Sequence, residues 1–367
     1  MEATKFLFYF LFLFSIFSTG HGSNSASFSG RHGHDHHHHH ELLHRRGNGF
    51  GATKLFVFGD SYADTGNIQK SIGGSWKEPY GVTFPGKPAG RFSDGRVLTD
   101  YIAKFYGLKS PVPYRWMKYA GNRVRYGMNF AYGGTGVFDT LVPEPNMTTQ
   151  IDFFEKLLLN DSVFNKGDLP SSLFLVTLAG NDYGSYTASG GTAQGLPIFI
   201  RRVVNQLSLN LKRLQKLGAK KIAVTALEPL GCLPRSTVVS SFQQCNVTEN
   251  IAVNFHNLLL NQAVTKLNND TKDGSSFVVL DLYSAFTTAL ENKGDFPGNL
   301  KFETPLKPCC MGIREGFNCG SVNEKGEKMY TLCNDTRSAF FWDGVHPTQA
   351  GWRAVSIALK TTLNQIH

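Results

Sequence analysis

The chain has 367 residues, of which 41% are hydrophobic and 18% charged, and its formal net charge is +9. This balance is that of an ordinary globular protein, and the length permits one large α/β domain or two smaller ones. The basic residues are scattered and form no compact stripe with interleaved aromatics. The charge therefore argues against nucleic-acid binding and leaves only a long-range attraction to anionic surfaces.

The first 22 residues have the pattern of a secretory signal. Lys5 supplies a positive start, and residues 6–17 are apolar apart from Ser15. This run is too short to span a bilayer comfortably, so a cleaved signal is the preferred interpretation and a retained signal anchor the alternative. No later segment approaches the ~20 apolar residues of a membrane span. We therefore expect a secreted, extracellular protein without stable membrane insertion.

Residues 23–51 form a polar lead-in that is rich in Gly, Ser and His and includes His32, His34 and the histidines at 36–40. Such a stretch cannot bury enough apolar surface to offset its chain entropy, so we expect disorder. Loose metal binding by the imidazoles is an alternative role.

From residue 54 onward, apolar runs alternate with amphipathic segments. Five runs are continuously apolar, as in strands covered on both faces: residues 54–58, 128–132, 173–178, 221–227 and 277–282. Five segments have helical patterns, two of them opened by Pro197 and Pro347: residues 97–106, 149–159, 197–217, 248–267 and 347–363. This alternation predicts an α/β fold, with a doubly wound, mostly parallel sheet between helices, in a single domain over residues 52–367.

Residues 291–341 interrupt this alternation and predict a long excursion tied by disulfides. All six cysteines lie between Cys232 and Cys333, and an even number in an exported chain indicates disulfides. Cys232 and Cys245 are a candidate local pair because they would close a short loop. The spacing leaves the pairing of the other four open: Cys309, Cys310, Cys319 and Cys333. A zinc site is the alternative, although no CxxC pair or interspersed histidine occurs there.

Five N-x-S/T sequons fit an exported glycoprotein: Asn146, Asn160, Asn246, Asn269 and Asn334.

His346 is the candidate general base. Of the twelve histidines only His256, His346 and His367 lie beyond the lead-in. His367 is the last residue and is expected to fray, and His256 falls in a helical pattern, where a satisfied or surface histidine is the usual outcome. His346 follows Asp343 by three residues, so one tight turn would bring that carboxylate to the imidazole. An ordinary helix-entry turn is the alternative.

Ser61 directly follows the first predicted strand, where ligands of open α/β sheets bind. A nucleophile and a helix N-cap are equally consistent with that position. Gly134 and Asn181 follow the second and third strands. The backbone N–H of Gly134, the side-chain amide of Asn181 and the backbone N–H of Ser61 would give three donors for one oxyanion. In isolation, Gly134 could be a simple turn and Asn181 an Asx-turn. The four features in this order favour an active site.

Four blocks resemble those of the GDSL esterase/lipase family, in the SGNH-hydrolase superfamily and specifically its plant secreted branch, over residues 55–366. The blocks are Phe56-Val57-Phe58-Gly59-Asp60-Ser61 with Asp64-Thr65-Gly66-Asn67, then Asn129-Phe130-Ala131-Tyr132-Gly133-Gly134-Thr135-Gly136, Ala179-Gly180-Asn181-Asp182-Tyr183, and Phe341-Trp342-Asp343-Gly344-Val345-His346-Pro347. Gly231-Cys232-Leu233-Pro234 and Pro308-Cys309-Cys310 are also similar to the plant branch.

The resemblance implies a flavodoxin-like α/β/α sandwich and hydrolysis of carboxylic esters through an acyl-enzyme, without metal or organic cofactor. It implies Ser61 as nucleophile and first oxyanion donor, the Asp343/His346 pair as base, and Gly134 and Asn181 as further donors, with Gly133 as the alternative register. The implied substrate is a small-molecule, lipid or cell-wall ester, and the implied location the apoplast or cell wall. A cell-wall carbohydrate O-deacetylase and a non-catalytic secreted glycoprotein are the alternatives, and the oligomeric state is left open.

One residue departs from the family pattern, since Tyr62 stands where the family name has leucine. The expectation for Ser61 is unchanged, because the leucine does no chemistry, but the pocket floor is expected to change shape. The sequence Gly59-Asp60-Ser61-Tyr62-Ala63 also lacks the G-x-S-x-G elbow of α/β-hydrolases, which argues against that fold.

Overall fold

The computed structural model describes residues 52–160, 163–178, 180–292 and 301–366. The predicted signal segment and histidine-rich lead-in lie outside these residues, as do His367 and residues 293–300 of the predicted excursion. Within the described ranges, no helix is both long and apolar enough to cross a membrane.

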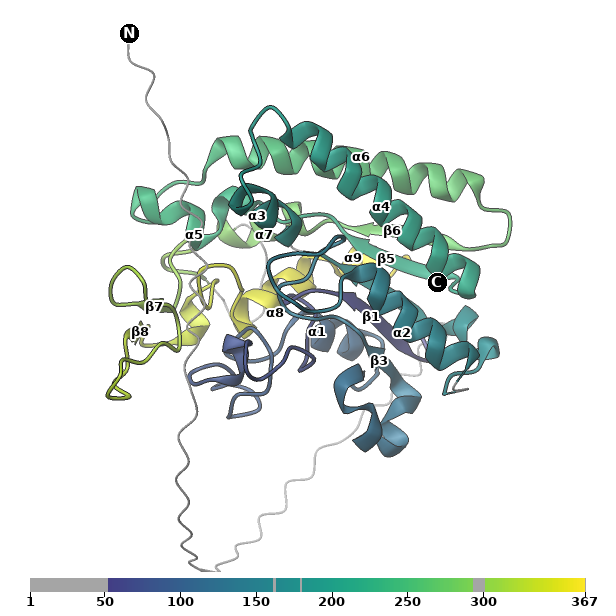
Figure 1. Cartoon of the computed structure of the whole chain (residues 1–367), viewed down its shortest axis with the longest axis horizontal. Helices are drawn as coiled ribbons and strands as arrows, with labels where there is room; N and C mark the ends of the chain where they lie inside the picture. The colour runs from purple at the N-terminus through teal and green to yellow at the C-terminus, as the bar shows by residue number, and fades with distance from the viewer. Residues whose placement is uncertain (1–51, 161–162, 179, 293–300, 367) are drawn as a thin grey trace, which may run out of the picture.

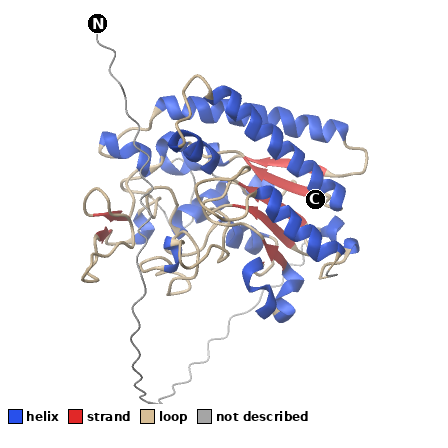
Figure 2. Cartoon of the chain, in the orientation of Figure 1, coloured by secondary structure: helices blue, strands red, loops and turns tan. Residues whose placement is uncertain are grey.

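A six-stranded sheet lies at the centre of the molecule, with all strands parallel (Figure 2). Its order is β2-β3-β1-β4-β5-β6. The strands are β1 (Leu55–Gly59), β2 (Val112–Pro113), β3 (Gly127–Asn129), β4 (Leu173–Thr177), β5 (Lys221–Thr225) and β6 (Ser276–Leu280). The predicted parallel α/β sheet is confirmed. Strand β2 lies at the sheet edge and was not predicted, because it is too short to form a recognisable apolar run.

Successive side chains of a strand point to opposite faces of the sheet, and helices cover both of these faces. Phe56 and Phe58 lie in the core beneath α2 (Met147–Leu159), α4 (Leu196–Leu217) and α6 (Val247–Asp270), and Figure 1 shows α4 and α6 side by side. Leu55 and Val57 lie in the other core, with α1 (Leu98–Phe105), α7 (Leu282–Leu290) and α8 (Gln349–Ala358). Burial on both faces explains why the strand sequences are continuously apolar.

The C-terminal helix begins later than the predicted start at Pro347. Thr348 is its N-cap and accepts from the Gly351 amide, while Pro347 pairs with Phe341 in an isolated bridge. The segment then divides into α8 and α9 (Lys360–Leu363). The structure adds α3 (Asn181–Ala188), α5 (Pro234–Thr237) and α7. Helix α3 is polar, so its sequence has no apolar periodicity. Short 3-10 turns are η1 (Gly74–Trp76), η2 (Tyr114–Tyr119), η3 (Gly121–Tyr126), η4 (Lys166–Ser171), η5 (Leu230–Cys232), η6 (Val238–Ser240) and η7 (Thr336–Ser338).

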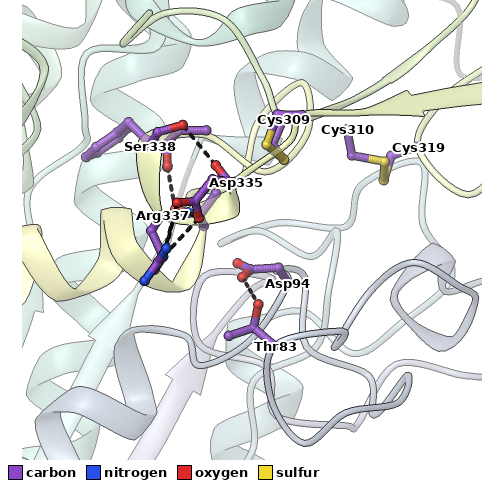
Figure 3. The surroundings of a disulfide bond; sticks show 12 residues. Thr83, Asp94, Cys309, Cys310, Cys319, Asp335, Arg337 and Ser338 are labelled. Atoms are coloured by element: carbon purple, nitrogen blue, oxygen red, sulfur yellow. Dashed lines mark hydrogen bonds and ion pairs between the residues drawn. A yellow bond between two sulfur atoms is a disulfide. The ribbon is translucent and has the colours of Figure 1, made fainter. Parts of the chain in front are cut away.

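The described part of the excursion carries a small antiparallel sheet, β7 (Cys310–Gly312) and β8 (Tyr330–Leu332). The six cysteines form three disulfides: Cys232–Cys245, Cys309–Cys333 and Cys310–Cys319. The predicted local pair is confirmed, and the zinc alternative is wrong because every thiol is bonded. Figure 3 shows the Cys310–Cys319 bond and, separately, the ion pair between Asp335 and Arg337.

Two backbone hydrogen bonds join this excursion to the final motif. The Cys309 amide donates to the Phe341 carbonyl at 2.9 Å and the Cys310 amide to the Trp342 carbonyl at 2.7 Å. The disulfide-tied segment therefore holds the chain directly before Asp343.

Candidate active site

The topology brings three predicted site residues to one edge of the sheet. Strand β1 lies between β3 and β4, so the chain leaves β1 toward one side of the sheet and later returns to the other. The carboxyl ends of strands at such a reversal form the usual ligand crevice of an open α/β sheet. Ser61, Gly134 and Asn181 follow β1, β3 and β4 respectively.

Ser61, His346 and Asp343 form a continuous hydrogen-bonded chain. His346 Nε2 lies 2.9 Å from Ser61 Oγ. His346 Nδ1 lies 2.8 Å from each carboxylate oxygen of Asp343. All three residues are at most 8% exposed, so the bonds are sheltered from water. The structure thus brings together a hydroxyl, an imidazole and a carboxylate in the order that nucleophilic catalysis needs.

The Asp343 carboxylate binds backbone amides of the turn that leads from Asp343 to His346. Asp343 Oδ1 accepts from the amides of Val345 and His346, both at 2.9 Å. The Tyr80 hydroxyl donates to Oδ2 at 2.7 Å. Burial alone would raise the pKa of Asp343, but the neighbouring His346 and these donors hold that pKa below its ordinary value. Asp343 is therefore a carboxylate that can fix the imidazole tautomer.

The end of β1 admits only glycine. Gly59 has φ of +142°, and a Cβ there would lie 1.8 Å from the Thr177 carbonyl oxygen. Buried Gln150 of α2 accepts from the Gly59 amide at 2.8 Å and donates to the Gly59 carbonyl at 2.9 Å. This two-bond clamp fixes the backbone two residues before the Ser61 hydroxyl.

The two candidate oxyanion glycines differ in what their amides do. The Gly133 amide donates to Asp64 Oδ2 at 2.9 Å, and burial raises the pKa of Asp64 to about 6. Neither the Ser61 amide nor the Gly134 amide has a hydrogen-bond acceptor among the described residues. This arrangement favours Gly134 over Gly133 as a donor to substrate.

Asn181 begins α3, and its side chain faces the same two loops. Its Nδ2 donates to Asp60 Oδ2 at 3.1 Å and to the Thr135 carbonyl at 3.0 Å. The next residue, Asp182, accepts from the amides of Val137 and Phe138, both at 2.9 Å. These hydrogen bonds attach α3 to the loop after β3 that contains Gly134. The position of the Asn181 amide is thereby fixed relative to Gly134.

Tyr62, the departure from the family pattern, is enclosed in the core. The residue is 1% exposed, its ring packs between Phe286 and Trp352, and its hydroxyl donates to the Val345 carbonyl at 2.9 Å. Aromatic packing directs the ring into the core next to the Asp343–His346 turn. Tyr80 and Gln150, which bind Asp343 and Gly59, were not predicted, since neither belongs to a motif and their contacts cross long stretches of chain.

His256 is a satisfied core histidine, which is one of the two outcomes expected for it. It is 4% exposed, and its Nδ1 lies 2.5 Å from the Tyr183 hydroxyl. Burial lowers its pKa to about 3. Across the part of the chain that the structure describes, no group of three His, Cys, Asp or Glu side chains is placed to hold a metal.

Comparisons with known proteins show the family to which this chain is similar. The family described as GDSL-like lipase/acylhydrolase matches residues 55–359. The GDSL esterase/lipase At5g03610 of Arabidopsis thaliana is 59% identical over 315 residues, which cover 86% of this chain and 88% of that protein. The GDSL esterase/lipase At3g09930 of the same plant is 55% identical, over 85% of this chain and 89% of its own. The solved acetylxylan esterase Axe2 from Geobacillus stearothermophilus aligns with 14% identity and a TM-score of 0.39, over 85% of this chain and 94% of that one.

Proposed function

The chain belongs to the GDSL-like lipase/acylhydrolase family and is a carboxylic ester hydrolase, and on that premise we propose that Ser61, His346 and Asp343 are its catalytic triad. The observation that carries this proposal is the pair of contacts made by one imidazole, 2.9 Å to Ser61 Oγ and 2.8 Å to Asp343. The second nitrogen is held by a carboxylate, so the first is left to accept the serine proton.

In the proposed reaction, His346 Nε2 takes the Ser61 proton as Oγ attacks the ester carbonyl carbon. The imidazolium then protonates the departing alkoxide, and an acyl-enzyme on Ser61 remains. Water attacks the acyl carbon while His346 takes one of its protons, and collapse of the second tetrahedral species returns that proton to Oγ and releases the acid. Asp343 stabilises the imidazolium in both halves of the cycle.

The proposed oxyanion hole consists of the Ser61 and Gly134 amides and the Asn181 side chain. The two backbone donors are available without rearrangement of described hydrogen bonds. The Asn181 amide is held at 3.1 Å from Asp60 and 3.0 Å from Thr135, and the developing oxyanion would take the place of the Asp60 acceptor. Such donors act where charge develops, so they lower the barrier more than they tighten substrate binding.

The triad is tested by hydrolysis of short-chain aryl esters by the wild type, Ser61→Ala and His346→Ala. We expect both variants to lose at least ~10³-fold in kcat, as triad knockouts do. Ser75→Ala is the matched control, because Ser75 is equally buried and its hydroxyl has no partner among the described residues. Undiminished turnover by Ser61→Ala, or labelling of that variant by a fluorophosphonate, would reject the assignment.

We further propose that the mature protein is a single hydrolase domain over residues 52–367, exported by a signal at residues 1–22 and preceded by the lead-in at 23–51. The sequons support export, because Asn160, Asn269 and Asn334 are exposed and Asn146 and Asn246 half-buried. Asn146 and Asn246 are helix N-caps that use Oδ1 as acceptor, and a glycan on Nδ2 would leave that oxygen in place. A mass decrease after glycosidase treatment of the secreted protein is the expected result; an unmodified mass would contradict glycosylation.

The remaining proposal concerns the ester. A series of aryl and glycerol esters of increasing acyl length, assayed beside acetylated polysaccharides, separates a lipid or small-molecule esterase from a cell-wall O-deacetylase. We propose that the protein is a lipid or small-molecule esterase, which would show a measurable kcat/KM on esters with acyl chains longer than acetyl. Activity confined to acetylated polysaccharide would instead support the deacetylase.

A further inference from the structure

Two residues outside the proposed triad bind the backbone of the catalytic turn. The Tyr62 hydroxyl donates to the Val345 carbonyl at 2.9 Å, and the Arg235 amide donates to the Gly344 carbonyl at 2.9 Å. Gly344 and Val345 are the only residues between Asp343 and His346. Both linking carbonyls of the turn are therefore fixed by neighbouring segments of the fold.

Packing gives the Tyr62 hydroxyl little freedom to move. Its ring centroid lies 4.9 Å from Trp352 in an edge contact and 6.1 Å from Phe286 in a stacked one. The residue is 1% exposed, and both partners are fully enclosed. A leucine could fill part of this volume but could not donate a hydrogen bond, so the hydroxyl is the functional difference that tyrosine introduces at position 62.

A buried carboxyl lies beside both contacts. Glu228 is 0% exposed, and neither of its carboxyl oxygens has a hydrogen-bond partner at normal geometry among the described residues. Burial raises its pKa to about 7, against the opposing effects of the Tyr62 hydroxyl and the Arg235 guanidinium. The charged groups that act on Tyr62 are Glu228, Asp60 and Arg235. An enclosed carboxyl is costly to keep in a core, so the presence of Glu228 calls for an explanation.

We propose that Tyr62, Arg235 and Glu228 are positioning residues that hold the Asp343–His346 turn so that His346 Nε2 faces Ser61 Oγ. Tyr62 and Arg235 fix the two carbonyls of the turn, and the Glu228 carboxyl acts electrostatically on the Tyr62 hydroxyl and the Arg235 side chain. This brace of Tyr62, Arg235 and Glu228 rests on the proposed triad, and the Tyr62 ring also makes an edge contact with the His346 ring, with 6.0 Å between the centroids.

The direct test compares Tyr62→Phe and Glu228→Gln with the wild type and with Tyr106→Phe. Tyr106 is the matched control, because its hydroxyl also donates to a backbone carbonyl, that of Leu363 at 2.9 Å, away from the turn. We expect kcat on an aryl ester to fall about 10-fold in both brace variants while KM stays within about 2-fold, since a small displacement of a catalytic group slows chemistry without weakening binding. Tyr106→Phe should retain the wild-type kcat.

A second measurement separates positioning from general stability. The acid limb of the kcat/KM profile reports ionisation of the base in the free enzyme. A loosened turn weakens the stabilisation of the imidazolium by Asp343, so the limb should move to lower pH in Tyr62→Phe but not in Tyr106→Phe. Thermal unfolding midpoints, measured beside the kinetics, identify a variant that is merely unstable, and if Glu228→Gln does not fold, Tyr62→Phe alone decides.

The proposal is overturned if Tyr62→Phe keeps both the wild-type kcat and the wild-type acid limb while Ser61→Ala is inactive. It is also overturned if both tyrosine variants lose the same activity, because a purely structural role would then explain the result. Turnover by Ser61→Ala would instead reject the triad on which the brace depends, so the two failures are distinguishable.

Discussion

The Tyr80 hydroxyl lies 2.7 Å from Asp343 Oδ2, so the carboxylate that holds the His346 imidazole is itself held by a residue from a distant part of the chain. Tyr80 is 6% exposed, and its ring lies 6.0 Å from that of Trp342, the neighbour of Asp343. The buried carboxylate thus has a donor that cannot easily be replaced by water.

Removal of this hydroxyl should slow the enzyme and weaken the fold. Hydrogen bonds to charged groups contribute about 1.5–3 kcal/mol, and each 1.4 kcal/mol is a factor of ten, so we expect Tyr80→Phe to lose about 10-fold or more in kcat/KM. The control is Tyr101→Phe, which removes a bond to the Gln349 carbonyl at 2.8 Å. Equal kcat/KM for Tyr80→Phe and the wild type would show that Asp343 does not need this donor.

Asn181→Ala should reduce kcat far more than it alters KM. Loss of one oxyanion donor typically costs about 10²- to 10³-fold in kcat, because the bond strengthens only as charge develops. Kinetics on a short-chain aryl ester, with exposed Asn261→Ala as the control, would test this. A change confined to KM would indicate that Asn181 binds the substrate rather than the transition state.

The candidate site could be proposed from the sequence because its residues stand at fixed positions relative to strands. Ser61, Gly134 and Asn181 each follow an apolar run, and parallel strands bring such positions to one edge. His346 could be selected because the other histidines beyond the lead-in were a helical one and the terminal one. The same reasoning could not distinguish Gly133 from Gly134, since the distinction depends on which amide Asp64 binds.

Long-range contacts had no signal in the sequence. Tyr80 and Asp343 are 263 residues apart, and Gln150 and Gly59 are 91 apart, so no local pattern connects them. Tyr62 was recognised as a departure from the family pattern, but its packing could not be predicted, because the rings of Phe286 and Trp352 that enclose it come from later helices. Polar α3 was missed for a different reason, namely that its helical period carries no apolar face.

The Cys309–Cys333 disulfide should support activity more than its neighbour does. It closes a separation of 24 residues, for which loop-closure entropy corresponds to about 3 kcal/mol. Its first cysteine also donates to the Phe341 carbonyl, just before Asp343. We expect the double variant Cys309→Ala/Cys333→Ala to unfold at a lower denaturant concentration than the wild type and to lose activity at a lower temperature.

The control for that prediction is Cys310→Ala/Cys319→Ala, which opens a separation of only 9 residues and leaves the larger loop closed. Residual esterase activity after a series of short incubations at rising temperature gives the comparison. If the control variant inactivates at the same temperature as Cys309→Ala/Cys333→Ala, the disulfide nearest the final motif has no special role.

His256 should make the fold sensitive to mild acid. Burial lowers its pKa to about 3 in the folded chain, against an ordinary value of 6.5, so the folded state binds fewer protons than the unfolded state between these values. The contribution of neutral His256 to stability is therefore complete above pH ~6.5 and is lost as pH falls, by at most ~1.4 kcal/mol per pH unit. His256→Gln keeps a polar partner for the Tyr183 hydroxyl but cannot titrate.

The variant should consequently show a flatter decline of the free energy of unfolding between pH 7 and pH 4.5 than the wild type. Urea titrations at three pH values would give the two curves, and their difference isolates His256 from the other titrating groups. Those groups act in both proteins: Glu228 and Asp64, whose pKa values burial raises to about 7 and to about 6, favour the folded state toward lower pH in this window. Parallel curves for the two proteins would mean that His256 can be protonated without unfolding the helix that carries it.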